Sequence, residues 1–429
     1  MKKIVAKVVA TALLAGSSLA VHAADELNVW IRANNNARVI YEQEAAAFEK
    51  QTGIKVSYFS ASTDFEQRLA RAAVGNTLPD LIINDAAYMG QLIQLNVVDA
   101  IEPSQLSYGK DLQPVALNSL KFGDGKYYGI PTSVQASALY IRKDWREKLG
   151  LPQPKTWDDL KALAKAFTEK DPDGNGKNDT YGFGLPGSAT RGYTSWILSS
   201  FIWQAGGEFV SRQGDAFKAS LDDKGVVDAV TFMRGMVCDK VVQPGAINAV
   251  TSDISNAFRS GQVGMVLSGP YSMPVFSNEP GPDKFEVVKP PRGPVSNASL
   301  AEGEAIFLVK SSKQKAQALK FIDFFISQEG QKIGTAVGTP NEPIVRLPVN
   351  KTVDANAIYQ DQRWGVFAEQ YASDGHYVPA VPNWTPIRQV TADGFNKILS
   401  NCQSDIPTEL KQLNEKVNIE LGKQKVLAK

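Results

Sequence analysis

The sequence predicts an α/β protein built of two lobes. Patterns typical of strands and helices alternate over the first 85 residues, as they do in parallel sheets covered by helices. The chain of 429 residues is also too long for one ordinary hydrophobic core, which favours two lobes. Its 43% hydrophobic and 21% charged residues are ordinary values for a globular protein.

The N-terminal segment 1–23 has the pattern of a secretory signal peptide. Three lysines precede an apolar stretch that is too short to remain as a membrane span, and small residues follow. Val21 and Ala23 occupy the −3 and −1 positions of a cleavage site after Ala23. Because no cysteine lies near this site, we expect a mature protein in the periplasm that is not lipid-anchored.

The first three strands are expected at 26–31, 54–59 and 80–84. Between them, the spacing of apolar residues predicts helices at 38–53 and 63–76. Ligands of open parallel sheets bind beyond the carboxyl ends of the strands. The polar loops that follow those ends should therefore converge on one side of the first lobe; they are 32–36, 60–64 and 84–85.

A second set of elements begins near Pro131. Thr156, with Asp159 three residues later, has the pattern of a capping box at the start of a helix. The further elements are expected at 193–205 (helix), 263–271 (strand), 304–310 (strand, followed by a helix that ends at 325) and 391–426 (mostly helical).

Charge and cysteine content limit the partners and the compartment. Without segment 1–23 the chain has 43 basic and 45 acidic residues, a net charge of −2. No run of lysine and arginine with interleaved aromatic residues is present, so we expect no nucleic-acid partner.

Cys238 and Cys402 are the two cysteines. In an oxidising compartment they are expected to form a disulfide, and two buried free thiols are the alternative.

Residues 171–182, DPDGNGKNDTYG, have the spacing of a calcium-binding loop. Oxygen donors stand at positions 1, 3, 5, 7 and 9, with only a carbonyl at position 7: Asp171, Asp173, Asn175, Lys177 and Asp179. Position 12 is Gly182 where a bidentate glutamate is usual, so the loop lacks a donor. An Asp/Asn/Gly-rich turn without metal is the alternative. We expect no required cofactor, and a calcium ion here would brace one lobe.

Few residues are suited to catalysis. His376 is the only histidine of the mature chain, and the nucleophile-elbow and P-loop motifs are absent. A pair of carboxylates could still serve a glycoside hydrolase, which is the enzyme alternative. Seven tryptophans, several of them beside predicted loops, favour the stacking of rings on sugars. Residue types alone leave the enzyme alternative open, and the family resemblance given next implies a binding protein and not an enzyme.

Several segments, in this order, resemble one known family. They are LNVWI, FEKQTGIKV, LARAAVGNTLPDLIIND, YYGIPTSVQASALYIRKD, TWDDLKALAKAF, SGQVGMVLSGPY and ALKFIDFFISQEGQ, followed by a helical C-terminus. Behind a signal peptide, this order is similar to that of the extracellular solute-binding proteins of carbohydrate ABC transporters, the family of maltose-binding protein. The resemblance covers essentially the whole mature chain.

The resemblance implies a periplasmic binding protein fold of two α/β lobes joined by inter-lobe crossing strands. The crossings would lie near 133, 289–294 and 344–347. Lobe one would hold 24–133 and 295–345, and lobe two 134–294 and 346–429. A monomer would capture a sugar or oligosaccharide in the cleft and deliver it to the permease subunits of an ABC importer.

Ligand positions of the family match ten residues of this chain. They are Asn34, Asn35, Asn36, Asp85, Gln135, Trp196, Tyr271, Glu302, Gly303 and Trp384. The resemblance implies that Trp196, Tyr271 and Trp384 supply aromatic rings, and that Glu302 and Gly303 lie in a glycine-rich cleft loop.

The identity of the ligand stays open at this stage. The asparagine cluster and Gln135 stand where relatives often carry charged residues. Arg32, Arg191 and Arg292 lie near predicted cleft loops, and guanidinium groups suit anionic ligands. A glycerophosphodiester or an anionic sugar is therefore an alternative ligand.

Overall fold

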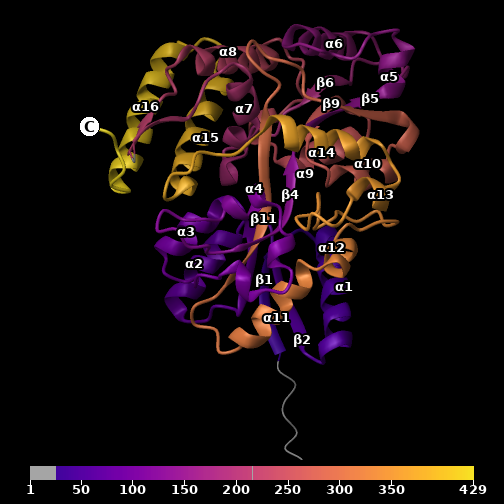
Figure 1. The fold of residues 1–429 in the computed structure, drawn as a ribbon. Helices are drawn as coiled ribbons and strands as arrows, with labels where there is room; N and C mark the ends of the chain where they lie inside the picture. Colours follow the sequence, from indigo (N-terminus) through magenta and orange to yellow (C-terminus); the bar gives the residue numbers. More distant parts are fainter. Residues whose placement is uncertain (1–25, 215) are drawn as a thin grey trace, which may run out of the picture.

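The computed structural model describes residues 26–214 and 216–429, and it shows two lobes joined by long strands (Figure 1). The predicted signal peptide at 1–23 lies outside the described residues. Within these ranges, no helix has both the length and the apolar character needed to cross a membrane.

Lobe one is built on a sheet whose first three strands are parallel. β1 (Glu26–Arg32) lies between β2 (Lys55–Ala61) and β3 (Leu81–Asp85). β11 (Ser299–Leu308) runs antiparallel beside β3 and also pairs with β4 (Ile130–Ala136). The alternation of strands and helices predicted for the first 85 residues is confirmed.

The helices of lobe one surround this sheet. α1 begins three residues earlier than predicted, because Asn34 caps it: Asn34 Oδ1 accepts a hydrogen bond from Ala37 N at 3.0 Å. Gly53 ends the same helix with a left-handed φ of 72°, as expected of a C-terminal glycine. The helices are α1 (Asn35–Thr52), α2 (Phe65–Gly75), α3 (Met89–Gln94), α4 (Pro114–Asn118), α11 (Lys315–Phe325) and α12 (Gln328–Ile333).

Lobe two has a four-stranded sheet of its own. Its order is β10 (Phe285–Val288), β5 (Ala138–Arg142), β9 (Val263–Ser268) and β6 (Tyr181–Gly184). A separate hairpin joins β7 (Val210–Gln213) to β8 (Ala216–Ala219). The helices are α5 (Lys143–Lys148), α6 (Trp157–Glu169), α7 (Tyr193–Gln204), α8 (Lys224–Cys238), α9 (Thr251–Arg259), α10 (Ser272–Asn278), α13 (Ala355–Tyr359), α14 (Arg363–Asp374), α15 (Trp384–Ser400) and α16 (Ile406–Lys423).

Capping residues set where several of these helices begin. The capping box predicted at Thr156 and Asp159 is present at the start of α6. The C-terminal helices begin earlier than the predicted position 391, since α15 already starts at Trp384, where Asn383 Oδ1 accepts a hydrogen bond from Thr385 N. Trp384 is therefore the first residue of a helix and not part of a preceding loop.

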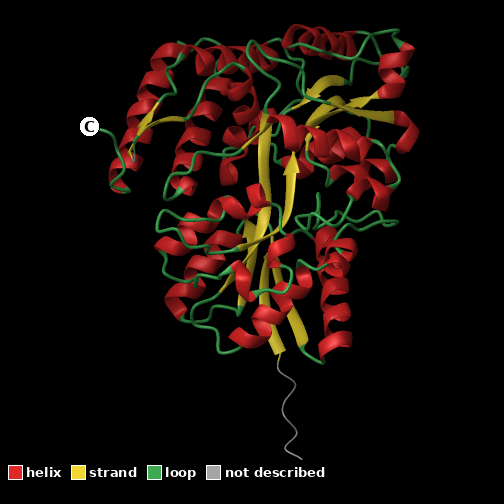
Figure 2. Cartoon of the chain, in the orientation of Figure 1, coloured by secondary structure: helices red, strands yellow, loops and turns green. Residues whose placement is uncertain are grey.

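β4 and β11 run side by side from one lobe into the other (Figure 2). The first residues of β11 pair with β12 (Gly375–His376), and Leu300 N donates to Ser200 Oγ of α7. The last residues of β11 pair with β3. The chain thus leaves lobe two within β11, several residues beyond the predicted crossing at 289–294. The predicted limits of the two lobes stay predictions.

A disulfide ties two helices of lobe two together. Cys238 is the last residue of α8, and Cys402 follows the end of α15. Their Cα atoms lie 5.9 Å apart, and the bond joins positions 164 residues apart in sequence. The pairing expected from the export signal is therefore present in the structure.

Candidate ligand-binding cleft

Two adjoining cavities lie between the lobes, beside β4 and β11. The smaller, of about 120 Å³, is named the polar chamber because charged side chains line much of it. Those charged residues are Arg32, Asp85, Arg191, Glu302, Glu304, Glu342, Arg346 and Arg388.

The larger cavity, of about 650 Å³, is named the apolar chamber. Phe122 of lobe one and Phe209, Val381 and Trp384 of lobe two line it, so its walls come from both lobes. Trp196, Glu302, Gly303 and Arg388 line both cavities, so the two chambers adjoin, and together they are named the cleft.

Seven of the ten predicted ligand residues line the polar chamber. They are Asn34, Asp85, Gln135, Trp196, Tyr271, Glu302 and Gly303. Residues far apart in the sequence are brought together here, because strands of the central sheet and helices of lobe two end at the same place.

The other three predicted residues lie elsewhere. Trp384 lines the apolar chamber, where its ring packs edge-on against Phe209 with centroids 5.2 Å apart. Asn35 and Asn36 are exposed on the first turn of α1 and line neither chamber. The interpretation of the asparagine run as one loop is wrong, since the helix starts inside it and only its cap, Asn34, faces the cleft.

The carboxyl ends of β1 and β3 supply the first charge pair. Arg32, the last residue of β1, donates from Nη2 to Asp85 Oδ1 at 2.7 Å, and Asp85 is the last residue of β3. Burial opposes ionisation of Asp85, but the guanidinium groups of Arg32 and Arg191 hold its pKa well below the usual range. Residues 60–64, which include the last two residues of β2, line neither chamber, so two of the three predicted loops reach the cleft.

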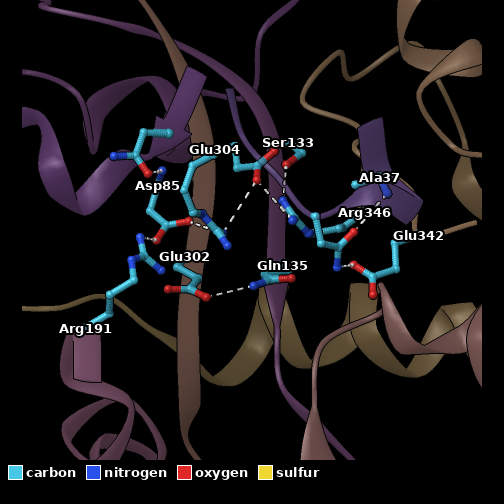
Figure 3. A network of polar contacts seen from close by, with 12 residues as sticks. Ala37, Asp85, Ser133, Gln135, Arg191, Glu302, Glu304, Glu342 and Arg346 are labelled. Atoms are coloured by element: carbon cyan, nitrogen blue, oxygen red, sulfur yellow. Dashed lines mark hydrogen bonds and ion pairs between the residues drawn. The ribbon is translucent and has the colours of Figure 1, made fainter. Parts of the chain in front are cut away.

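Glu304 anchors a second cluster in β11 (Figure 3). Its carboxylate accepts hydrogen bonds from Tyr41 Oη at 2.9 Å and from Arg346 Nη2 at 3.1 Å, and Arg32 Nη2 lies 3.8 Å away. Glu304 is only 3% exposed, so these cations offset the loss of its hydration.

Glu302 links three elements at the junction of the chambers. Its Oε1 accepts hydrogen bonds from Trp196 Nε1 of α7 at 2.9 Å and from Gln135 Nε2 of β4 at 2.8 Å. Burial, with the charge of Asp85 adding to it, raises the pKa of Glu302 above its ordinary value. Glu302 and Gly303 lie inside strand β11, paired with Gln135 and Val134. The prediction of a glycine-rich loop at this position is wrong.

The aromatic residues of the polar chamber are held by polar contacts. Tyr271 lies under the Arg346 guanidinium, whose Cζ is 5.7 Å from the ring centroid. Burial raises the pKa of Tyr271 to about 12, so its hydroxyl stays protonated and can donate at neutral pH. Trp196 is 9% exposed, and its indole N–H is held by Glu302.

Arg346 and Arg388 are the principal cleft residues that sequence reasoning missed. Arg346 lies inside the predicted crossing at 344–347, in a segment with no distinctive pattern. Arg388 carried a usable signal: in α15 it shares one helical face with the buried Trp384, Thr391 and Phe395, where a charge is unusual. Of the three arginines noted in the sequence, Arg32 and Arg191 line the polar chamber, whereas Arg292 is exposed outside it.

The loop at 171–179 folds through its own hydrogen bonds. Asp171 Oδ1 accepts from Gly174 N and Asn175 N at 3.1 Å each, and Asp171 Oδ2 accepts from Gly176 N at 3.0 Å. Asn175 Nδ2 donates to Asp173 and Asp179. Across the described ranges, no three acidic, histidine or cysteine side chains are grouped so as to hold a metal ion. Calcium binding by this loop stays a prediction.

The chain is similar to known bacterial binding proteins. The family model of the bacterial extracellular solute-binding proteins matches residues 34–332. A binding protein of Brucella abortus (strain 2308) is 27% identical over 362 residues, which cover 83% of this chain and 84% of that protein. A maltooligosaccharide ABC transporter solute-binding lipoprotein of Streptococcus pneumoniae is 24% identical over 323 residues, covering 72% and 70% of the two chains.

A solved structure shares the fold. The GacH receptor of Streptomyces glaucescens, determined unliganded and in complex with acarbose, superposes with a TM-score of 0.81 at 20% identity. The match covers 93% of this chain and 99% of that one. The two-lobed α/β fold expected from the sequence is therefore confirmed.

Proposed function

This chain belongs to the bacterial extracellular solute-binding protein family, and we propose that it captures a sugar or oligosaccharide in its cleft for an ABC importer. Capture would be followed by delivery to the permease subunits in the membrane. The observation that carries the proposal is the pair of adjoining chambers between the lobes, in which aromatic rings lie beside buried hydrogen-bonding groups.

Both lobes contribute to the polar chamber. Lobe one supplies Arg32 and Asp85, lobe two supplies Trp196 and Tyr271, and the crossing strands supply Gln135 and Glu302. A ligand that bonds to both halves favours the closed arrangement of the lobes, because it loses half of its contacts when they separate. The closed form is then the one that a permease can recognise.

The chemistry of the lining suits a polyhydroxylated molecule. Flat rings at Trp196, Tyr271 and Trp384 can pack on the apolar faces of sugar rings. Carboxylate, amide and guanidinium groups beside them can hydrogen-bond the hydroxyl groups. Two of the similar proteins, by their names, bind maltooligosaccharides or acarbose, which supports a carbohydrate as the ligand.

No bond of the ligand is made or broken in this proposal. Glu302 and Glu304 already serve as acceptors for neighbouring donors, which favours a structural role for both carboxylates. Release of reducing sugar from a glycan by the purified protein would instead support a periplasmic glycoside hydrolase.

We place the mature protein in the periplasm as a monomer, released after Ala23 and without a lipid anchor. The pattern of segment 1–23 supports this location. Capture should need no cofactor. A chelator that removes calcium is therefore expected to leave ligand affinity unchanged, whatever it does to the stability of the loop at 171–179.

Isothermal titration calorimetry with a panel of mono- and oligosaccharides tests the proposal. We expect one ligand per chain, and about a tenfold or greater loss of affinity in Gln135→Ala, since Glu302 then loses a buried donor. Arg292→Gln is the matched control, because Arg292 is exposed outside the cleft. Binding of a glycerophosphodiester with no response to any sugar would contradict the proposal.

A further inference from the structure

Arg388 of α15 is a buried cation that forms no contact ion pair with a described carboxylate, although its charge acts on Asp85 and Glu302 from a greater distance. Its side chain is 7% exposed and lines both chambers. Its Nε is buried without a hydrogen-bond partner among the described residues, as is the Nε of Arg32 and of Arg346, so the difference lies in the ion pair and not in Nε. No ion pair joins its guanidinium to any described carboxylate, although such a pair is found for each of the other three arginines of the polar chamber.

The other three arginines of the polar chamber are each paired with a carboxylate of the protein. Arg32 lies 2.7 Å from Asp85, Arg191 lies 2.7 Å from Glu66, and Arg346 lies 3.1 Å from Glu304. A charge that is taken out of water is stable only when it is paired, and removal of the partner is strongly unfavourable. Arg388 is the exception in this chamber, so a ligand is the natural source of its missing anion.

The nearest carboxylate does not take that role. Glu302 lies at the junction of the chambers with Arg388, but its Oε1 is held by Trp196 and Gln135. Burial and the charge of Asp85 raise the pKa of Glu302, while the positive charge of Arg388 opposes that rise. Arg388 thus acts on Glu302 from a distance, and its guanidinium stays available.

The backbone is shaped to hold Arg388 in place. Gly192 has a left-handed φ of 80°, and a Cβ atom there would lie 2.5 Å from Cγ and 2.7 Å from Nε of Arg388. The Arg388 Cζ is 6.0 Å from the centroid of the Tyr88 ring. The side chain is therefore fixed between a glycine and an aromatic ring, with its end groups at the boundary of the two cavities.

The charged residues of the apolar chamber also favour an anionic ligand. Glu302 is the only carboxylate residue in its described lining, whereas Lys121 joins Arg388 there. Apolar walls at Phe209 and Trp384 leave space beyond Arg388 for further sugar units. An acidic oligosaccharide would place one carboxylate on Arg388 and continue along this chamber.

We propose that the ligand is an acidic carbohydrate, and that Arg388 binds the carboxylate of one of its uronic acid units. This inference rests on the proposed function and adds the chemical class of the sugar. A guanidinium can meet a carboxylate through two parallel hydrogen bonds, a geometry that a neutral hydroxyl cannot match. A single unpaired cation among several carboxylates favours a singly charged group over the two charges of a phosphate ester.

Calorimetry on the full chain tests the inference with three matched sets of ligands. The first is glucuronate and galacturonate with their di- and trisaccharides, the second is the corresponding neutral sugars, and the third is hexose phosphates. We expect the acidic sugars to bind about tenfold to a hundredfold more tightly than the neutral ones. Arg388→Gln should abolish this preference, Arg388→Lys should keep part of it, and Arg292→Gln should leave it unchanged.

Each other outcome has a definite meaning. Equal or tighter binding of neutral sugars by the wild type would overturn the acidic ligand and leave the proposed function standing. A preference for hexose phosphates would overturn the carboxylate. If no carbohydrate binds, the proposed function fails as well. The comparison of acidic with neutral sugars needs only the wild-type protein, so it decides the question even if a variant fails to fold.

Discussion

Arg191 of lobe two forms a two-point ion pair with Glu66 of lobe one. Arg191 Nη2 lies 2.7 Å from Glu66 Oε1, and Arg191 Nε lies 3.1 Å from Glu66 Oε2. The two side chains are only 7% and 15% exposed. Arg191 Nη2 also reaches Asp85 Oδ2 at 3.3 Å. One residue of lobe two therefore holds two acids of lobe one across the cleft.

Glu66→Gln is expected to weaken closure of the lobes. The substitution keeps the shape of the side chain but removes a partly buried charge-assisted contact between the lobes. Ligand-free protein should then be more open, and affinity should fall about tenfold, because less of the protein is in the binding-competent form. Small-angle scattering of the ligand-free protein and calorimetry measure the two effects.

The control for this variant is the residue just before the same helix. Asp64 pairs with Arg68 at 2.6 Å within lobe one, with both side chains well exposed. Asp64→Asn should change neither the scattering curve nor the affinity, since exposed pairs contribute little. Equal behaviour of the two variants would show that the Arg191–Glu66 pair does not bias the lobes.

Gly192→Ala is expected to reduce both stability and ligand affinity. The new Cβ would need a left-handed φ of 80° and would lie 2.5 Å from Arg388 Cγ. The left-handed backbone costs an alanine about 1 kcal/mol of stability. The close contact displaces Arg388, which lines the cleft. Gly53→Ala is the matched control, because its φ of 72° is similar but nothing lies within 4 Å of its Cβ position. We expect Gly53→Ala to lower the melting temperature and leave affinity unchanged. An unaltered affinity in Gly192→Ala would contradict the assigned position of Arg388.

Glu44 gives the protein a pH-dependent weakness in lobe one. The residue is fully buried in α1, and neither carboxylate oxygen has a hydrogen-bond partner among the described residues. Burial, with the charge of Glu329 adding to it, raises the pKa of Glu44 well above the unfolded value of about 4.3. Folding therefore takes up a proton at pH values between the unfolded and the folded pKa of Glu44. Stability that is present below about pH 4 is lost as pH rises toward the folded pKa.

Glu44→Gln should remove this pH dependence. At pH 8 we expect the variant to be more stable than the wild type by about 1–3 kcal/mol, with little difference at pH 4.5. Urea unfolding at the two pH values measures the free energy of unfolding. Glu42→Gln in the same helix is the control, since Glu42 is exposed and pairs only with Arg38. If the difference in free energy of unfolding between Glu44→Gln and the wild type is the same at both pH values, the assignment is refuted.

Reduction of the Cys238–Cys402 disulfide should lower stability without affecting capture. A loop of 164 residues is closed by this bond, and the chain-entropy estimate for such a loop is about 4–5 kcal/mol. Double substitution of both cysteines by serine should therefore lower the melting temperature clearly. Calorimetry should give the wild-type affinity, because neither cysteine lines a chamber. An affinity loss that persists at a temperature where the variant is folded would contradict this separation.

Sequence reasoning succeeded where the signal was local. Periodicity placed β1, β2, β3 and the helices between them, and the rule for carboxyl ends of parallel strands directed Arg32 and Asp85 to the cleft. It failed where pairing with a distant strand decides the conformation. Glu302 and Gly303 have the composition of a loop but form a strand, because β4 lies beside them with its own hydrogen-bonding groups to satisfy.

The sequence by itself determined the α/β class and the order of the elements, and the family resemblance named seven residues that line the polar chamber. Only the tertiary structure decided which charges are paired. Whether an arginine is neutralised depends on distances of a few ångströms between residues that lie far apart in the chain, and periodicity carries no information about such distances. For this reason the sequence does not tell that Arg32, Arg191 and Arg346 are paired with carboxylates, and that Arg388 forms no such contact pair.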